Sequence, residues 1–234
     1  MWLVNSDRSI TTPLHRNEVK FLVRCKGCLR PVSGNVVPLR LSVPSCREQF
    51  KRLMGNSLPE MKLHDLIEIV QLFDKHHIEL YIDGGWGVDA LLGKQTRSHA
   101  DLDIAIQYKD SPQVCAFLEA RGYSNVHRAD SSDFNFVLGD HQGHHIDIHT
   151  YTFDAAGSHI YGIPYPLESL AGNGSLDGHL VKCISAEWVV KFHTAYQFDE
   201  DDYRDVKAIC QHFNLKMPLE YEDFERNLLQ QGRS

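Results

Sequence analysis

Hydrophobic and polar positions follow two different periods along this chain, and together they predict a mixture of helices and strands. Over residues 62–76, apolar residues recur mostly at three- and four-residue intervals, which is typical of an amphipathic helix packed on a sheet. Residues 79–83 and 101–107 read as strands, with a short helix over 86–92 between them. Gly93 is expected to end that helix, because glycine readily adopts the left-handed conformation that follows a helix.

The second half of the chain predicts a further helix, a hairpin and two closing helices. Ser111 and Pro112 are expected to begin a helix that reaches about residue 121, with the serine as N-cap and the proline at the first helical position. The other expected elements are a hairpin of strands 134–138 and 144–151 around a turn at 140–143, an irregular Gly- and Pro-rich stretch over 152–182 that includes a short hairpin or loop, a helix over 186–197 capped by Ser185, and a last helix over 200–213. This order predicts an α+β (mixed α/β) fold with a small mixed sheet, flanking helices and C-terminal helices.

Length and composition predict one compact domain with a smaller helical appendage, because 234 residues that are 42% hydrophobic can bury a substantial core. No apolar run approaches the roughly 18 residues that span a bilayer, and the N-terminus does not read as a secretory signal. A cytoplasmic protein without a membrane partner is therefore expected. The six cysteines are scattered, which indicates reduced thiols and not a disulfide framework.

Charged residues are distributed unevenly along the chain. Residues 1–60 hold ten Lys/Arg against four Asp/Glu, a net charge of +6, which leaves 14 against 27, or −13, for the remainder. A dedicated nucleic-acid-binding protein needs a basic face for phosphates, so the acidic body argues against a nucleic acid partner. It suits a small cationic substrate, although an acidic surface that only maintains solubility has the same balance.

The N-terminal 60 residues show neither helical nor strand periodicity and contain several Pro and Gly residues. Met54 and Met61 both stand just before the first convincing helix, so we interpret residues 1–60 as a basic extension that is disordered or non-native. Cys25-x-x-Cys28 forms half of a zinc knuckle, but no second pair with a usual spacing follows it. We therefore expect no metal site in this segment.

Two short motifs carry the strongest chemical signal. Gly84-Gly85 follows the first strand, and Asp101-x-Asp103 opens the second. Side chains alternate along a strand, so both aspartates point to one face and need a cation between them. Oxygen ligands favour a hard ion such as Mg²⁺, which usually also binds substrate phosphates. The glycines let N–H groups near a helix N-terminus approach a phosphate. These motifs predict a nucleoside triphosphate and metal site; a plain tight turn and two solvated aspartates are the alternative.

A third carboxylate lies in the segment His145-Ile-Asp147-Ile-His149. Its two isoleucines face the core, so His145, Asp147 and His149 share the opposite face. If this strand lies beside the strand of Asp101 and Asp103, Asp147 completes a three-carboxylate cluster, as a metal ligand or as the base that accepts a proton from an attacking hydroxyl. His149 would bond to Asp147 or to substrate, or serve as a structural histidine.

The stretch GGWGVDALLGKQTRSHADLDIAI, together with HHIDIH and CISAEWVVKFHTAYQFDEDDYRDVKAI, resembles the antibiotic nucleotidyltransferases of the DNA polymerase β-like superfamily. It is most similar to the small lincosamide nucleotidyltransferases and next to the aminoglycoside 2″-nucleotidyltransferases, over roughly residues 61–216. The resemblance implies a polymerase β-like core, Asp147 as its third acidic residue, and a role for His99 in the T-R-x-H segment. Arg97 of the same segment is suited to a bidentate grip on phosphate oxygens.

This resemblance implies an enzyme that transfers a nucleoside monophosphate, AMP from ATP, to a hydroxyl of a small antibiotic. A lincosamide is the first expected acceptor and an aminoglycoside the second. The expected catalytic and Mg²⁺-binding residues are Asp101, Asp103 and Asp147, and the expected nucleotide-binding residues are Gly84, Gly85, Arg97 and His99. A minimal nucleotidyltransferase that modifies a protein as an antitoxin, and a binding protein with an inactive site, are the alternatives.

The expected organisation has a catalytic core over residues 61–152 and a substrate-binding helical region over 153–234. The expected partners are the antibiotic and the NTP, and a homodimer is left open.

Overall fold

The computed structural model describes residues 59–231. The expected basic extension, with Cys25-x-x-Cys28, lies almost wholly outside the described residues. The helices are α2 Leu63–Lys75, α3 Gly84–Leu92, α4 Ser111–Glu119, α5 Ala186–His193, α6 Glu200–Phe213 and α7 Leu219–Gln231, with 3-10 turns η1 Tyr108–Asp110 and η2 Leu167–Ala171. The strands are β1 Leu80–Asp83, β2 Asp101–Gln107, β3 Ser124–Val126, β4 Asn135–Gly139, β5 His145–Phe153, β6 His159–Gly162, β7 Gly172–Leu176 and β8 His179–Cys183.

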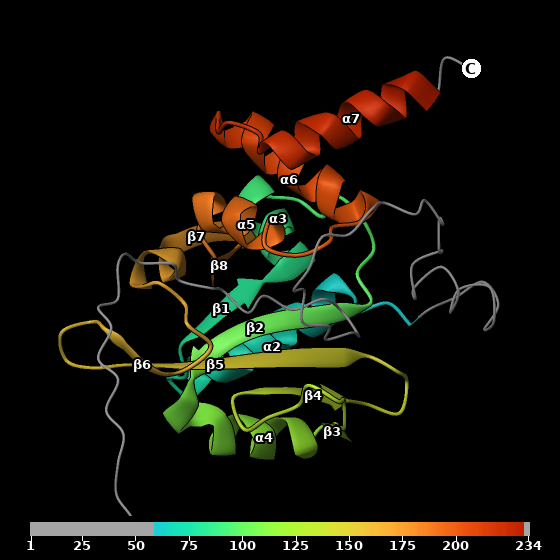
Figure 1. Cartoon of the computed structure of the whole chain (residues 1–234). Helices are drawn as coiled ribbons and strands as arrows, with labels where there is room; N and C mark the ends of the chain where they lie inside the picture. Colours follow the sequence, from blue (N-terminus) through green and yellow to red (C-terminus); the bar gives the residue numbers. More distant parts are fainter. Residues whose placement is uncertain (1–58, 232–234) are drawn as a thin grey trace, which may run out of the picture.

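The strands form one mixed sheet in the order β3-β4-β5-β2-β1-β8-β7, and β6 pairs with β5 (Figure 1). β2 lies in the middle, antiparallel to β1 and parallel to β5. β8 adds to the far side of β1 in the parallel direction, at Ile82 and Cys183. The sheet therefore includes strands from both sides of residue 153, where the sequence suggested a boundary between the core and the C-terminal region.

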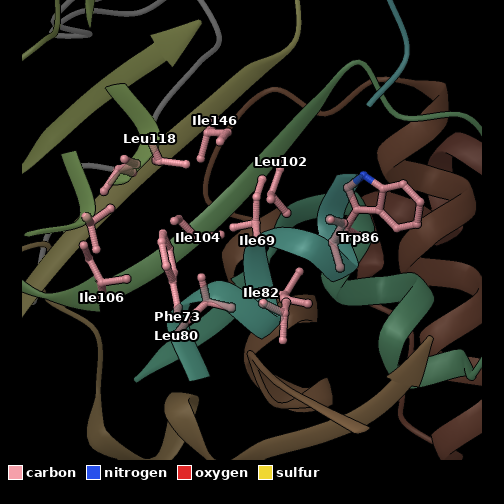
Figure 2. Packing of buried hydrophobic residues seen from close by; sticks show 14 of the residues in the cluster. Ile69, Phe73, Leu80, Ile82, Trp86, Leu102, Ile104, Ile106, Leu118 and Ile146 are labelled. Carbon is pink, nitrogen blue, oxygen red and sulfur yellow. The ribbon is translucent and has the colours of Figure 1, made fainter. Parts of the chain in front are cut away.

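Two apolar clusters cover the two faces of this sheet. The alternation along β2 creates them, since Leu102 and Ile104 point to one face while Asp103 and Ala105 point to the other. The first cluster packs the sheet against α2 and α4, and Figure 2 shows Phe73 of α2 beside the isoleucines of β2. The second cluster packs the other face against α5 and α6, which lie above β1 and β2 in Figure 1. The carboxylates of β2 thus face the C-terminal helices.

Several expected elements differ in their ends, and two were not expected. α3 begins at Gly84, two residues before the expected start, and α5 ends at His193, before the expected residue 197. β3 and α7 have weak periodic signals, because β3 is three residues long without a buried position, and α7 mixes charged, polar and apolar residues on its exposed side. The stretch 152–182 is more regular than expected, with β6 and the β7–β8 hairpin inside it.

The expected serine cap of α4 is wrong. Ser111 is the first helical residue, Asp110 holds the N-cap position, and no side-chain cap hydrogen bond forms there. The hydroxyl of Ser111 is buried and has no hydrogen-bond partner among the described residues. The 3-10 turn Tyr108–Asp110 leads directly into α4, so the chain is already helical where a cap would need an extended backbone.

No helix within residues 59–231 is both long and apolar enough to cross a membrane. In the same part of the chain Cys115, Cys183 and Cys210 are free thiols, as expected.

Candidate active site

Three aspartates stand in one row across three neighbouring strands. Asp83, the last residue of β1, is paired with Asp103 of β2, and Asp103 is paired with Asp147 of β5. Residues paired across strands point to the same face, so the three carboxylates are neighbours. We call Asp83, Asp103 and Asp147 the acidic row. The expectation that the strand of Asp147 lies beside the strand of Asp101 and Asp103 is confirmed.

Asp83 is a member of the row that the sequence analysis missed. The signal was available, because Asp83 ends the first strand with the same parity as Tyr81 and immediately precedes the glycine pair. Its carboxylate has a second function as the N-cap of α3, since Oδ1 accepts a hydrogen bond from the backbone N–H of Gly84 at 2.8 Å. Asp101 lies on β2 two residues before Asp103 and is paired with His145 of β5.

The glycine pair lies directly against the side chains of the site. Gly84 has a φ of 58°, and a Cβ there would overlap Oδ2 of Asp103. A Cβ on Gly85 would come within 2.5 Å of Arg97 Nη2 and of His99 Nδ1. Gly84 therefore lets the N-terminus of α3 pack on Asp103, and Gly85 lets it pack on Arg97 and His99. The N–H of Gly84 already donates to Asp83, so it is not a free donor for a ligand. The contribution of Gly84 is the backbone conformation that brings the helix close to Asp103.

Arg97 makes a bidentate contact with the carboxylate of Asp205. Its Nη2 donates to Asp205 Oδ2 at 2.7 Å and its Nε donates to Asp205 Oδ1 at 3.3 Å. Burial alone would lower the pKa of Arg97, but the hydrogen bond and charge of Asp205 raise it above its ordinary value. Because Asp205 lies on α6, this pair joins the loop before β2 to the C-terminal helices.

His99 belongs to a buried polar cluster behind the glycines. The ring is 3% exposed, and its Nε2 lies 2.5 Å from Asp89 Oδ2. The other oxygen of Asp89 accepts from the backbone N–H of Thr96 at 2.9 Å and from its hydroxyl. The ring also stacks at a tilt on Trp86, with centroids 4.5 Å apart. These contacts fix the loop between α3 and β2, and the ring of His99 lies against Gly85.

Two further residues reach the acidic row from loops. Arg128 Nη1 lies 3.3 Å from Asp147 Oδ2, and the hydroxyl of Tyr165 donates to Asp83 Oδ2 at 2.8 Å. His149 stands between them, with Nε2 3.5 Å from Asp147 Oδ1 and Nδ1 3.1 Å from the Tyr165 oxygen. The sequence analysis placed His149 correctly on the face of Asp147. It missed Arg128 and Tyr165, because loop residues have no periodicity that predicts their direction.

The charges in this site perturb the groups around it. Burial, followed by the charge of Asp83, raises the pKa of Tyr165 well above its usual range. Burial, followed by the positive charge of Arg128, lowers the pKa of His145. Titratable groups with shifted pKa values that lie beside a cluster of carboxylates are common at functional sites.

Asp101 and Asp103 offer oxygen donors of the type that Mg²⁺ prefers, and Mg²⁺ is usually held by one or two carboxylates together with substrate phosphates and water. Within residues 59–231, no three His, Cys, Asp or Glu side chains form a ready metal-binding group. The donor chemistry nonetheless fits the ion, and the overlap of a Gly84 Cβ with Asp103 leaves the helix N-terminus and this carboxylate in direct contact.

The chain matches a family model described as aminoglycoside-2″-adenylyltransferase over residues 65–209. A lincosamide resistance protein from Staphylococcus haemolyticus is 32% identical over 151 residues, which cover 62% of this chain and 92% of that protein. A 2″-aminoglycoside nucleotidyltransferase from Escherichia coli is 27% identical over 125 residues, which cover 53% of this chain and 67% of that protein.

Solved structures give the same picture of the fold. The crystal structure of the lincomycin-bound lincosamide antibiotic adenylyltransferase LnuA has a TM-score of 0.57 and 28% identity, and the match covers 64% of this chain and 97% of that one. The crystal structure of ANT(2″)-Ia in complex with adenylyl-2″-tobramycin has a TM-score of 0.54 and 20% identity, over 72% of this chain and 97% of that one. These likenesses confirm the α+β fold expected from the sequence.

Proposed function

We propose that this chain, which belongs to the aminoglycoside-2″-adenylyltransferase family, transfers AMP from ATP to a hydroxyl of a lincosamide. The family resemblance and the nucleotidyltransferase activity expected from the sequence are both confirmed. The choice of acceptor is supported by the lincosamide resistance protein, because the match at 32% identity spans 92% of that relative. The observation that carries the chemistry is the pairing of Asp103 with Asp147, next to the glycine turn.

The site divides into a nucleotide side and an acceptor side. Gly84 and the N-terminus of α3 follow Asp83 and lie against Asp103 in the middle of the acidic row, where backbone N–H groups and the helix dipole favour a triphosphate. Asp101 and Asp103 would hold Mg²⁺, and the ion when bound supplies positive charge that offsets the charge on the α-phosphate and the leaving pyrophosphate. Asp147 at one end of the row faces the acceptor.

The transfer itself requires one new bond, one broken bond and one moved proton. The acceptor oxygen attacks the α-phosphorus in line with the leaving group, so the bond to the attacking oxygen forms as the bond to pyrophosphate breaks. Asp147 takes the proton of the attacking hydroxyl as general base. Asp147 is 4% exposed, and Arg128 and His149 lie 3.3 and 3.5 Å from its two carboxylate oxygens.

The sequence suggested Arg97 as a nucleotide-binding residue, and its contact with Asp205 supports a role in the attachment of α6. Arg128 is a guanidinium that contacts the acidic row directly, through Asp147.

An aminoglycoside remains the second candidate acceptor, because the matched family model is described by that activity and because the acidic part of the chain attracts cations. A mass-spectrometric assay separates the two. Pure protein is incubated with Mg²⁺, a mixture of NTPs and a panel of lincosamides and aminoglycosides. We expect an AMP mass increment on a lincosamide; an increment only on aminoglycosides would reverse the order of the candidates, and no increment on any drug would contradict drug modification.

The matched control for this assay is Asp103→Asn, which keeps the shape of the side chain and removes its charge. Loss of product with this variant ties the activity to the acidic row. Asp177→Asn, an exposed position in the β7–β8 turn, should leave the product unchanged.

A further inference from the structure

Tyr165 lies in the loop between β6 and η2, outside every motif that the sequence analysis singled out. The loop is attached to β5, because the N–H of Ile163 donates to the carbonyl of Thr150 at 2.7 Å. Pro164 and Pro166 stand on either side of the tyrosine. Each proline fixes its own φ and restricts the residue before it, so the backbone at Tyr165 has little freedom.

The ring of Tyr165 is held by other aromatic rings in the second apolar cluster. It is 3% exposed and makes edge contacts with Tyr151 of β5 and Phe192 of α5, at centroid distances of 6.1 and 5.7 Å. Edge-to-face contacts of this kind favour one ring orientation. The hydroxyl is therefore directed at the acidic row by packing from two elements.

This hydroxyl makes one contact on each side of the row. It donates to Asp83 Oδ2 at 2.8 Å, and its oxygen lies 3.1 Å from His149 Nδ1. Since the hydroxyl hydrogen is given to Asp83, the oxygen accepts the Nδ1–H of His149. The histidine ring then lies with Nε2 3.5 Å from Asp147 Oδ1, a contact that is attractive when Nε2 also carries a proton.

The two partners of Tyr165 come from strands that are not neighbours. Asp83 ends β1, His149 lies on β5, and β2 runs between them. The second oxygen of Asp83 accepts the N–H of Gly84 at 2.8 Å, so Asp83 also fixes the first turn of α3. One hydroxyl thus connects the turn on the nucleotide side with the histidine beside the proposed base on the acceptor side.

We propose that Tyr165 is a positioning residue for the transfer step: its hydroxyl holds Asp83 and His149 in register across β2, and through His149 it orients Asp147. This inference rests on the proposed function. In this proposal Tyr165 acts through its contacts with Asp83 and His149 and not by contact with phosphate or acceptor. Its contribution therefore belongs to the geometry of the reacting groups and not to nucleotide affinity.

The test is Tyr165→Phe, with Tyr151→Phe as the matched control. Both changes remove one hydroxyl from a buried ring of the same aromatic cluster, but only Tyr165 contacts the acidic row. We expect Tyr165→Phe to lower kcat by about 10- to 100-fold, the usual effect of losing a group that orients a reacting residue. The KM for ATP should not change, because ground-state binding is intact. Tyr151→Phe should keep the kcat of the wild type.

A double-mutant cycle with His149→Asn checks the route. If the hydroxyl acts through the histidine, the decrease in kcat of the double variant should be little larger than the greater of the two single decreases. Equal losses for Tyr165→Phe and Tyr151→Phe, an unchanged kcat, or a loss confined to KM would each overturn the proposal. Thermal unfolding of every variant separates these outcomes from a failure to fold.

A second readout does not depend on turnover. In ¹⁵N-histidine NMR of the ligand-free protein, Tyr165→Phe should shift the Nδ1 signal of His149. The signal of His193, whose Nδ1 is bonded to the Val189 carbonyl at 2.8 Å, should stay in place. An unmoved His149 signal would contradict the hydrogen bond itself. Absence of product with the wild-type protein would instead contradict the proposed function and leave the NMR result to decide the contact.

Discussion

Asp103 on β2 stands directly opposite Asp147 on β5, and on its other side it stands opposite Asp83 on β1. Three carboxylates at strand-pair distances repel one another unless a cation or hydrogen-bond donors lie close by. The protein supplies Arg128 at one end and the hydroxyl of Tyr165 at the other. The middle of the row, where Asp103 meets the glycine turn, is where we propose that the metal and the phosphates bind.

Gly84→Ala should abolish transfer while leaving a folded protein. The φ of 58° costs an alanine about 1–2 kcal/mol, and its Cβ would overlap Asp103 Oδ2. Gly178→Ala is the matched control, because its φ of 79° carries the same backbone cost with no atom within 4 Å of the added Cβ. Urea unfolding should show similar losses for both variants, and the transfer assay should show a loss for Gly84→Ala alone. Equal activities would mean that Asp103 has room to move.

Removal of the partner of Arg97 should destabilise the attachment of α6. Asp205→Ala leaves a guanidinium that is 23% exposed without its carboxylate, and we expect a loss of roughly 3 kcal/mol in the free energy of unfolding, at the lower end for broken buried pairs. Glu200→Gln on the same helix breaks the exposed pair with Arg204 and should cost less than about 0.5 kcal/mol. Chemical denaturation measures both. Similar losses in the free energy of unfolding for the two variants would show that burial does not make the Arg97–Asp205 pair more stabilising than an exposed pair.

Mg²⁺ and ATP together should stabilise the protein, and removal of the metal should reverse the effect. A ligand at 100 times its Kd adds about 2.7 kcal/mol to the free energy of unfolding, which thermal scans detect as a higher Tm. EDTA should return the Tm to the value without ligand. Asp101→Asn should reduce the shift, whereas Asp177→Asn in the distant β7–β8 turn should keep it. If Asp101→Asn kept the full ligand-induced rise in Tm, Asp101 would not be a ligand of the metal.

Asp140, in the turn before β5, should make the free energy of unfolding depend on pH in the acidic range. Burial raises the pKa of Asp140, but hydrogen bonds from His144 outweigh it, so the net pKa lies below the usual 3.8. A carboxyl whose folded pKa is depressed contributes stability above its unfolded pKa and loses that contribution as the pH falls through the folded value. Asp140→Asn should therefore cost stability at pH 7 and progressively less below about pH 4. The free energy of unfolding of both proteins, measured from pH 3 to pH 7, gives the difference. A difference independent of pH would mean that the charge of Asp140 is not the stabilising feature.

Local sequence patterns predicted many of the helices and strands of this protein and the main motifs of its site. The strand bounds of β2 and the helix bounds of α6 agree with the expected ranges, because each segment has a strong period and a clear boundary. Asp199 and Asp202 close a capping box that fixes the start of α6. The chemistry of the site was also visible, since a glycine pair and Asp101-x-Asp103 lie within one short stretch of sequence.

The sequence by itself determined which face each side chain of a strand takes, and therefore that Asp101 and Asp103 point together and that Asp147 and His149 point together. Only the tertiary structure decided that these two faces meet, because strand order depends on packing between segments far apart in the chain. It also decided that Arg97 binds Asp205 and that Tyr165 reaches Asp83. Such contacts depend on the direction of loop side chains, which no local period determines.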